Sequence, residues 1–520
     1  MQRYNILWAD DEIDLLKPHI LFLENKGNKI TAVNNGAEAI EQCENNNFDV
    51  VFLDENMPGM SGLETLDRIK VIRPSLPVIM ITKSEEEQIM EDAIGAKIAD
   101  YLIKPLNPNQ ILLSMKRILE NKRLVSEKTN INFQQGFRDL SMAVNENPDF
   151  REWAAIYKDF IFWDLEMEST QNKSMSEVLD AQRDEANSNF SKYIIENYED
   201  WLNDPDIDKP LLSNQLMKKK VFPLLEEGVS VFFVVIDNLR YDQWKIIEPI
   251  LQEYFDVEKE ESYYSILPTT TAFSRNSIFS GMMPLEMAER HPSLWVGDET
   301  DEGKNNFEEE WLGIQLKKNG LGNIKYSYQK IKHISEGKSL IESINNIRGN
   351  SLNAIVYNFV DMLSHARTDM AMIRELAPDE SAYRSITRSW FEHSPLLEAL
   401  ELISRKKAKL VITTDHGTIR VKRAFRIVGD KNTNTNLRYK TGRNLNFEKG
   451  KVMEVPNPAR LMLPSANLSS SYAIATEDKF FAYPNNFNYY VNYYKDTFQH
   501  GGISLEEMII PVISLNSKNG

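Results

Sequence analysis

The sequence predicts a multidomain α/β protein with a doubly wound parallel domain, an all-α helical bundle as connector, and a larger α/β domain. At 520 residues the chain is too long for one core and suggests about three domains. In the first part of the sequence, short apolar runs alternate with helix-length segments. In the next part, apolar residues recur only at helical spacing. In the second half, apolar runs end in Asp or His, a pattern typical of sites at the carboxyl edge of a parallel sheet. We therefore predict domains at residues 1–120, 121–205 and 206–520.

The composition narrows the class of protein. An apolar content of 42% is typical of globular domains. A net charge of −17 argues against an extensive nucleic-acid surface or an anionic membrane partner, although a local basic patch remains possible. Cys43 is the only cysteine, which excludes disulfides and thiolate metal sites and favours a reducing compartment. No signal peptide or membrane-spanning apolar run is present, so we expect a cytoplasmic protein without membrane insertion.

Polar residues follow the predicted strands of the first domain. The strand candidates are Tyr4–Trp8, Lys29–Val33, Val50–Leu53, Val78–Thr82 and Asp100–Ile103. The polar residues at or after their ends are Asp10, Asp11, Asp54, Thr82 and Lys104. Neighbouring carboxylates repel one another unless a cation lies among them, and Mg²⁺ accepts one or two carboxylates while keeping several waters. Strand-end capping is the alternative reading of any one of these residues.

The order Asp-Asp, Asp, Thr, Lys-Pro, together with DENMPGMSGLE at 54–64, resembles the receiver domain of two-component response regulators. The resemblance implies that Asp10, Asp11 and Asp54 hold Mg²⁺. It also implies that a sensor histidine kinase phosphorylates Asp54, which acts as the nucleophile. Lys104 would neutralise the acyl phosphate, and Thr82 and Tyr101 would form the switch. Phosphorylation-dependent homodimerisation is a further expectation.

The connector shows apolar and aromatic residues at helical spacing, such as Trp153, Ile156, Tyr157 and Phe160. This pattern predicts three to five packed helices. We interpret the aromatic stripe as core and not as a ligand site. A DNA-recognition helix is not apparent. Such a bundle could carry strain from Asp54 to the next domain, although the sequence alone does not establish this.

Five motifs of the larger domain combine metal-binding and nucleophilic residues. In VFFVVIDN (231–238) the apolar run is followed by Asp237. In LVITTDHGT (410–418) it is followed by Asp415 and His416. NAIVYNFVDMLSHA (353–366) predicts a strand ending at Asp361, with His365 on the same face if the chain then turns helical. Two further motifs contain Thr271, Arg275 and His500.

A predicted strand ends at Pro268, and PTTTA (268–272) then places Thr271 at a predicted helix N-terminus, which favours anions. Arg275, one turn later, would contact a bound phosphate as a substrate-binding residue. A plain threonine N-cap and a surface arginine are the alternatives. His500 precedes a Gly-Gly turn and a final strand.

The candidate ligands form two sets. The first comprises Asp237, Thr271, Asp415 and His416, and the second comprises Asp361, His365 and His500. Oxygen and imidazole ligands without cysteine suit zinc and, less strongly, manganese. For Asp-His-Gly alone, a capping aspartate beside a solvated histidine is the more ordinary interpretation, and the other motifs of the chain favour the metal site.

The order Asp, Thr, Asp-x-x-x-His, Asp-His-Gly, His-Gly resembles the alkaline phosphatase superfamily, in its PglZ branch. The resemblance implies two metal ions and Thr271 as catalytic nucleophile. No third-metal site is apparent, which favours phosphodiesters over monoesters. Together with the receiver-like start, the whole chain is similar to the PorX family of response regulators. That similarity implies a role in type IX secretion and, as a partner, a sigma factor.

Two functions are therefore expected as alternatives. The first is a phosphorylation-controlled metal-dependent phosphodiesterase acting on oligonucleotides or cyclic nucleotides. The second is a non-catalytic interaction module that binds a sigma factor or secretion component. A segment with eight basic residues and one acid, at 420–443, fits a polyanion-gripping loop or, equally, a solvated hairpin or a dock for acidic parts of the chain.

Overall fold

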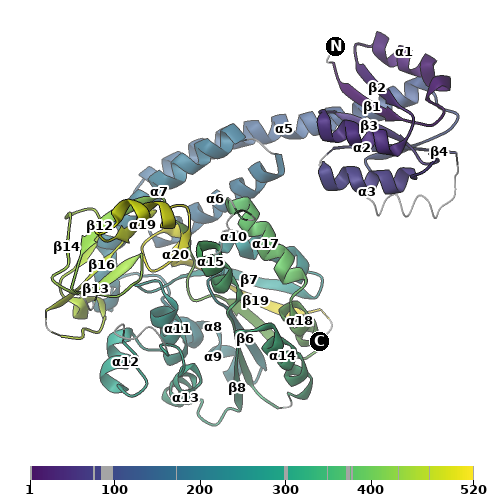
Figure 1. Cartoon of the computed structure of the whole chain (residues 1–520). Helices are drawn as coiled ribbons and strands as arrows, with labels where there is room; N and C mark the ends of the chain where they lie inside the picture. Colours follow the sequence, from purple (N-terminus) through teal and green to yellow (C-terminus); the bar gives the residue numbers. More distant parts are fainter. Residues whose placement is uncertain are drawn as a thin grey trace. The chain divides into compact units, whose positions relative to one another are not determined.

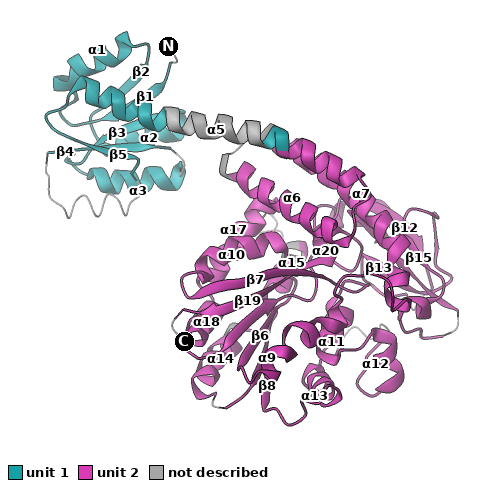
Figure 2. Ribbon diagram, turned by 180° about the vertical axis from the view of Figure 1, so that it is seen from behind, with its two compact units in different colours: residues 1–135 teal, residues 136–520 magenta. Residues whose placement is uncertain are grey.

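The computed structural model describes residues 3–73, 76–83, 98–170, 173–297, 303–347, 349–369, 375, 377, 379–430, 433–467 and 469–518. For residues 120–132, 169–170, 173–174, 334, 365–367 and 369 it describes the backbone alone. The chain divides into two compact units, residues 1–135 and 136–520 (Figure 2). Each unit contains its own hydrophobic core.

The first unit contains a parallel five-stranded sheet in the order β2-β1-β3-β4-β5. Its strands are β1 (Asn5–Ala9), β2 (Lys29–Val33), β3 (Val50–Asp54), β4 (Val78–Thr82) and β5 (Asp100–Ile103). Its helices within the described residues are η1 (Ile13–Leu16), α1 (Lys17–Asn25), α2 (Gly36–Asn45), α3 (Gly62–Ile72) and the start of α5 (Pro108–Asn145). The predicted doubly wound fold is confirmed, with strand ends shifted by at most one residue.

The side chains of each strand alternate between the two faces of this sheet, so both faces are apolar and both are covered by helices. Leu7 and Leu53 pack with α2 and α3, whereas Ile6, Trp8 and Phe52 pack with α1 and α5. Successive side chains of a strand point to opposite faces, so each strand contributes to both layers. The strands therefore read as continuous apolar runs, and polar groups collect at their carboxyl ends.

The predicted all-α connector is confirmed as long helices. It consists of α5, α6 (Phe150–Thr170) and α7 (Lys173–Asn203). The aromatic stripe is core, because Trp153, Phe160, Phe190 and Tyr198 are each at most 1% exposed. Trp153 packs edge-on against Phe190 with ring centroids 5.5 Å apart. The connector helices α6 and α7 thus bury their apolar faces within the second unit.

A six-stranded mixed sheet organises the larger α/β domain, in the order β7-β19-β10-β6-β9-β8 (Figure 1). Its strands are β6 (Val231–Ile236), β7 (Phe255–Tyr264), β8 (Tyr326–Ile331), β9 (Leu352–Tyr357), β10 (Lys409–Thr413) and β19 (Ile509–Ser517). Strands β10, β6, β9 and β8 are parallel, and β19 is antiparallel to β10 and β7. Every residue of β6 is buried, as its uninterrupted apolar sequence predicts.

Helices cover both faces of this sheet. One face packs against α8 (Leu216–Lys220), α9 (Phe222–Glu226), α11 (Thr271–Ser280) and α13 (Glu308–Lys318). The other carries α10 (Tyr241–Leu251), α14 (Ile334–Asn346), α17 (Glu380–Glu392) and α18 (Pro395–Ser404). The remaining helices are η2 (Ser213–Gln215), α12 (Pro284–Arg290), α15 (Phe359–Asp369), η3 (Pro458–Leu461), α19 (Phe487–Tyr494) and α20 (Leu505–Met508).

Three small sheets complete the domain. They pair β11 (Ile419–Arg420) with β18 (Phe498–Gln499), β12 (Arg423–Val428) with β14 (Asn446–Phe447) and β17 (Lys479–Ala482), and β16 (Ser470–Ile474) with β13 (Tyr439–Arg443) and β15 (Met453–Val455). Among the helices in the described ranges, none is long and apolar enough to cross a membrane.

Two predicted strand ends are wrong. Strand β9 stops at Tyr357, so Asp361 does not end a strand but lies in the first turn of α15. Strand β7 stops at Tyr264, six residues before the Thr270 that precedes α11, and not at Pro268. In each case irregular residues let the chain turn from the sheet edge into a helix. The functional side chains therefore come from helix starts as well as strand ends.

Candidate functional site

Three carboxylates meet at the carboxyl edge of the first sheet. Oxygens of Asp10, Asp11 and Asp54 all lie within 4.8 Å of one another. Lys104 Nζ lies 2.8 Å from Asp54 Oδ1 and 2.9 Å from Asp10 Oδ2. Burial raises the pKa of Asp54, Lys104 opposes this shift, and the negative charge of Asp10 adds to it. A hard cation such as Mg²⁺ would relieve the repulsion, so the residues fit the predicted ion.

Of the predicted switch residues, Thr82 lies at the same edge, whereas Tyr101 lies two residues before the end of β5, level with Met80. Thr82 ends β4 and is buried, and Tyr101 lies on β5 with 40% of its surface exposed. Because β3, β4 and β5 are adjacent and parallel, these residues follow Asp54 across the sheet. Their switching role remains a prediction.

Asp237, Asp415 and His416 lie together at the carboxyl edge of the second sheet. β6 and β10 are adjacent and parallel, with Val235 opposite Thr413, so both chains leave the sheet at the same level. Asn238 adopts a left-handed conformation (φ 62°) and turns the chain directly after Asp237. Ligand atoms of the three residues lie within 4.8 Å of one another, and all three side chains are buried.

Thr271 completes the first predicted set. It is the first residue of α11, and its Oγ1 lies 3.0 Å from His416 Nε2 and 3.4 Å from Asp237 Oδ1. The Nδ1 atom of His416 lies 3.1 Å from the Gly417 carbonyl oxygen. A hydrogen bond to this carbonyl leaves Nε2 as the nitrogen that faces the site. The threonine hydroxyl thus shares its surroundings with a carboxylate and an imidazole.

The carboxylate of Asp415 indicates that this cluster suits a divalent cation. Its Oδ2 atom is buried and, within the described part of the chain, accepts no hydrogen bond. Arg275 and His416 nitrogens each lie 3.7 Å from this oxygen. Burial raises the pKa of Asp415 to about 6, and the charge of Asp237 adds to the rise. Two buried carboxylates beside an imidazole, with one oxygen unsatisfied, match the ligand chemistry of zinc.

The predicted substrate-binding residue Arg275 pairs with carboxylates of the domain. It borders the cavity but is only 1% exposed. It donates to Asp237 Oδ2 at 2.6 Å and to Glu308 Oε1 at 2.5 Å. Burial acts to raise the pKa of Asp237, but Arg275 and His416 outweigh it and hold this pKa below its usual value. Arg275 therefore holds Asp237 in its charged form, and direct contact with substrate stays a prediction.

No sequence motif marks the further partners of Arg275. Glu308 at the start of α13 is buried, and its Oε2 lies 3.0 Å from Lys330 Nζ. The Tyr328 hydroxyl also donates to Glu308. The only sequence signal for Glu308 was its place in the acid-rich stretch 298–310, which was considered as a partner of the basic segment 420–443.

The second predicted set adjoins the first. His500 Nε2 lies 3.6 Å from Asp361 Oδ1, and Asn238 Nδ2 donates to the same oxygen at 3.3 Å. The imidazole rings of His416 and His500 stack with centroids 4.3 Å apart. Position 365 belongs to α15, four residues after Asp361, but the side chain of His365 lies outside the described residues. Asp361 and His500 are thus available as ligands beside Asp237 and His416.

A cavity of about 530 Å³ opens in front of these residues. Thr271, Asp361 and His500 form part of its lining. Other lining side chains are cationic or amides, namely Lys304, Lys330, Lys332, Asn305, Asn434 and Asn436. A polar cavity with lysines beside a candidate nucleophile is chemically suited to an anionic substrate.

The basic segment at 420–443 is largely compensated inside the fold. Arg438 is fully buried and donates to both carboxylate oxygens of Glu507, at 3.1 and 2.6 Å. The other ion pairs join Arg420 to Asp496, Lys422 to Asp184, and Arg423 to Glu477 and Asp478. Lys431 lies outside the described residues. This pairing favours a structural role over a loop that grips a polyanion.

Lys440 belongs to the same segment and makes a pH-dependent contribution to stability. It is 1% exposed, and burial lowers its pKa to about 8. The unfolded chain therefore binds more protons than the folded chain between pH 8 and the ordinary lysine value of about 10.4. We expect the free energy of unfolding of this domain to rise with pH across that window by up to about 3 kcal/mol.

The Lys440→Met variant tests this expectation. It should unfold at a higher temperature than the wild type at pH 7 and should lack the rise between pH 8 and 10. Thermal unfolding at a series of pH values is the measurement. Lys449→Met, which changes an exposed lysine, should keep the wild-type profile. Equal pH slopes for Lys440→Met and the wild type would contradict the argument.

Comparisons with known proteins assign families to three consecutive segments. Residues 6–116 match the response regulator receiver domain, and residues 123–202 match the PorX response regulator linker domain. Residues 216–515 match the BREX system PglZ alkaline phosphatase-like domain, which is more than half of the chain. The receiver family implies phosphorylation by a histidine kinase.

Curated relatives match the first part of the chain. The transcriptional regulatory protein ZraR of Klebsiella oxytoca is 33% identical over 123 residues, which are 24% of this chain and 28% of ZraR. ResD of Bacillus subtilis is 33% identical over 114 residues, 22% of this chain and 47% of ResD. The chain thus spans less than half the length of these relatives.

Solved structures also match the first part. A CheY-like receiver domain protein from Methanospirillum hungatei is 27% identical, covering 23% of this chain and 96% of the other, with a TM-score of 0.23. A two-component response regulator from Clostridium difficile is 31% identical, covering 22% and 96%, with a TM-score of 0.22. The family assignment rests on the three family models. By these matches, the chain belongs to the PorX-like response regulators, in which a receiver domain and a helical linker precede a PglZ alkaline phosphatase-like domain.

Proposed function

We propose that the PglZ domain is a metal-dependent phosphodiesterase with Thr271 as nucleophile, controlled by phosphorylation of Asp54. The observation that carries this proposal is the position of Thr271 Oγ1, which lies 3.0 Å from His416 Nε2 and 3.4 Å from Asp237 Oδ1. Thr271 is also the first residue of the ten-residue helix α11, and the N-terminus of a helix favours negative charge. A nucleophile, candidate metal ligands and an anion-favouring dipole therefore coincide.

The proposed hydrolysis has two steps. Thr271 Oγ1 attacks phosphorus, the bond from phosphorus to the alcohol oxygen breaks, and the alcohol leaves with the proton that Thr271 loses. Water then cleaves the phospho-threonine, releasing a phosphate monoester and restoring the hydroxyl. Asp237, Thr271, Asp415 and His416 would hold one divalent ion, and Asp361, His365 and His500 a second. When bound, such ions lower the pKa of coordinated hydroxyls and stabilise charge on phosphoryl oxygens.

The substrate class follows from the cavity in front of Thr271. Lys304, Lys330 and Lys332 supply positive charge, and asparagines such as Asn305 and Asn434 supply both donors and acceptors. This lining suits a short oligonucleotide or a cyclic nucleotide better than an apolar ester. A cavity of about 530 Å³ lies within the usual range for small-ligand sites.

Regulation would come from the receiver. A sensor histidine kinase would phosphorylate Asp54 in the presence of Mg²⁺, and the phosphorylated chains would form a homodimer. We place this activity in the cytoplasm, with type IX secretion as the regulated process and a sigma factor as a protein partner. Zinc is the proposed ion of the PglZ domain, with manganese as substitute.

Removal of metal tests the enzymatic proposal. Hydrolysis of a model phosphodiester should fall at least about 100-fold after chelation and should return when Zn²⁺ or Mn²⁺ is added. Asp415→Asn should prevent this recovery, because it removes one buried ligand. Asp256→Asn changes an aspartate whose side chain is 71% exposed, and it should recover fully. Full hydrolysis after chelation would contradict the proposal, and no hydrolysis under any condition would support a non-catalytic interaction module.

A further inference from the structure

The short helix α20 lies between the two turns that present the histidines of the site. All four of its residues are buried. On one side the Gly417 N–H, next to His416, donates to the Glu507 carbonyl at 3.3 Å. On the other side the Gly502 N–H, two residues after His500, donates to Glu507 Oε1 at 2.8 Å. The position of α20 therefore affects both turns.

These contacts leave little room for adjustment. A Cβ atom on Gly417 would lie 2.0 Å from the Glu506 carbonyl oxygen, and one on Gly502 would lie 2.5 Å from an Arg438 nitrogen. The Thr269 hydroxyl, two residues before Thr271, accepts from Gly501 N–H at 3.1 Å and donates to the Gly502 carbonyl at 2.8 Å. The spacing of His416 and His500 is thus set by close backbone packing around α20.

A connector residue holds α20 in place. Asn187 on α7 is 3% exposed, and its Oδ1 accepts from the Leu505 N–H, the first residue of α20, at 2.8 Å. Its Nδ2 lies 3.1 and 3.4 Å from the two carboxylate oxygens of Glu506. One side chain of the connector therefore satisfies both the backbone and a side chain of this helix.

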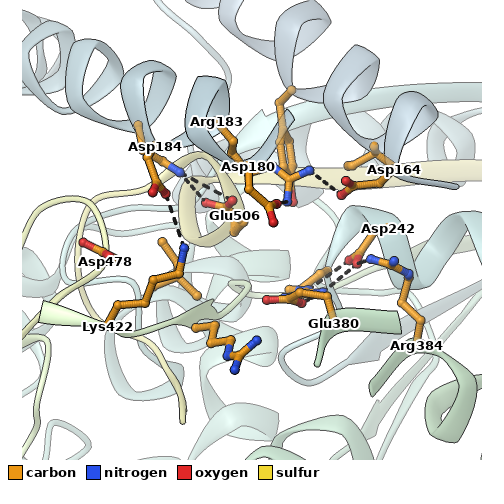
Figure 3. A pocket seen from close by; sticks show the side chains of 16 residues that line it. Asp164, Asp180, Arg183, Asp184, Asp242, Glu380, Arg384, Lys422, Asp478 and Glu506 are labelled. Carbon is orange, nitrogen blue, oxygen red and sulfur yellow. Dashed lines mark hydrogen bonds and ion pairs between the residues drawn. The ribbon is translucent and has the colours of Figure 1, made fainter. Parts of the chain in front are cut away.

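A small charged cavity adjoins this contact (Figure 3). Its volume is about 120 Å³, and Asn187 and Glu506 belong to its lining together with Arg183 and Asp184 of the connector. Figure 3 shows the Glu506 carboxylate among these connector side chains. The contact between the connector and α20 thus borders a polar space and not a close-packed apolar core.

We propose that Asn187 is a positioning residue for the candidate metal pair: through α20 it sets the spacing between the turns of His416 and His500. The proposal rests on the proposed two-metal function. It also gives the connector a continuous hydrogen-bonded link to the site, from α7 through Leu505, Glu506 and Glu507 to Gly417 and Gly502. A displacement of α7 would be transmitted along this link to both histidines.

The first test is titration of the full chain with Zn²⁺ by calorimetry, in excess Mg²⁺ to saturate the receiver carboxylates. The wild type should bind two Zn²⁺ ions. Asn187→Leu should weaken at least one of these by about 10-fold, the lower end of the range for lost hydrogen bonds to metal ligands, because Asn187 acts through α20 and not on a ligand directly. Asn189→Leu is the matched control: this residue lies on the same helix, but its bonds go to Val144, Asn145 and Lys192 and not to α20.

A second pair of variants keeps the test decisive if Asn187→Leu does not fold. Asn187→Asp places two carboxylates in contact and should weaken Zn²⁺ binding. Combining it with Glu506→Gln restores a hydrogen bond with donor and acceptor exchanged, and the double variant should recover to within about threefold of the wild type. Wild-type Zn²⁺ affinity in Asn187→Leu or Asn187→Asp, or a double variant as weak as Asn187→Asp, would overturn the inference alone. A wild type that binds no Zn²⁺ would overturn the proposed function as well.

Discussion

Thr271→Ala is expected to lower phosphodiester hydrolysis by at least about 1,000-fold while the metal content of the protein stays unchanged. The variant removes the proposed attacking oxygen. It leaves Asp237, Asp415 and His416 in place, and these three already lie within 4.8 Å of one another without the threonine. Elemental analysis and steady-state hydrolysis of the same preparation are the two measurements. A loss of metal together with activity would instead identify Thr271 mainly as a ligand.

Thr271→Ser is the matched variant, because it keeps a hydroxyl at the start of α11 and deletes only a methyl group. It should retain a measurable fraction of the wild-type rate. A phosphorylated intermediate trapped by rapid quenching should carry its label at position 271 in the wild type and be missing in Thr271→Ala. Undiminished turnover in Thr271→Ala would exclude this residue as nucleophile, and a water molecule would then be the attacking group.

The edge of each sheet could be predicted from the sequence because parallel buried strands are uninterrupted apolar runs. The run VFFVVI ends at Asp237 and LVIT ends near Asp415, and strands that are adjacent and parallel release both chains at one level. The same reasoning located Asp54 and Thr82 in the receiver. Resemblance to known families then joined Thr271, His416 and His500, whose sequence distances carry no periodic signal.

Interactions between charged side chains could not be predicted in this way. Arg275 looked like a phosphate ligand, but its guanidinium contacts Asp237 and Glu308. Arg438 looked like part of a polyanion-binding loop, but it is bonded to Glu507 inside the domain. Each of these ion pairs depends on how segments distant in the sequence pack together. The local sequence around an arginine indicates neither how deeply it is buried nor which carboxylate it contacts. A charged residue in an apolar environment must find such a partner, which the sequence does not name.

The connector shows the same contrast between apolar patterns, which the sequence reveals, and polar contacts, which it does not. Helical periodicity and the buried aromatic stripe were evident in Trp153 and Phe160, because apolar spacing reports a core face. The contacts of Asn187 with α20 were not evident, since one polar residue on a helix is most often solvated. Only the packed structure reveals that its amide satisfies the first N–H of α20. Polar residues that connect domains therefore need a structure for their identification.

Asp54→Asn is expected to abolish phosphoryl uptake by the receiver. An asparagine amide cannot form an acyl phosphate. We expect Asp10 and Asp11 not to replace Asp54 as acceptor, because they follow the neighbouring strand β1, whereas Asp54 ends the central strand β3. Incubation with acetyl phosphate and Mg²⁺, followed by intact-mass analysis, should give one added phosphoryl group in the wild type and background labelling in the variant.

Asp14→Asn is the control, since this side chain is 84% exposed and pairs with Lys17 at the surface. It should be labelled like the wild type. Sedimentation of the same samples measures the proposed dimer: the mass should rise on phosphorylation in the wild type and in Asp14→Asn, and stay constant in Asp54→Asn. Labelling of Asp54→Asn at the wild-type level would move the acceptor to another residue.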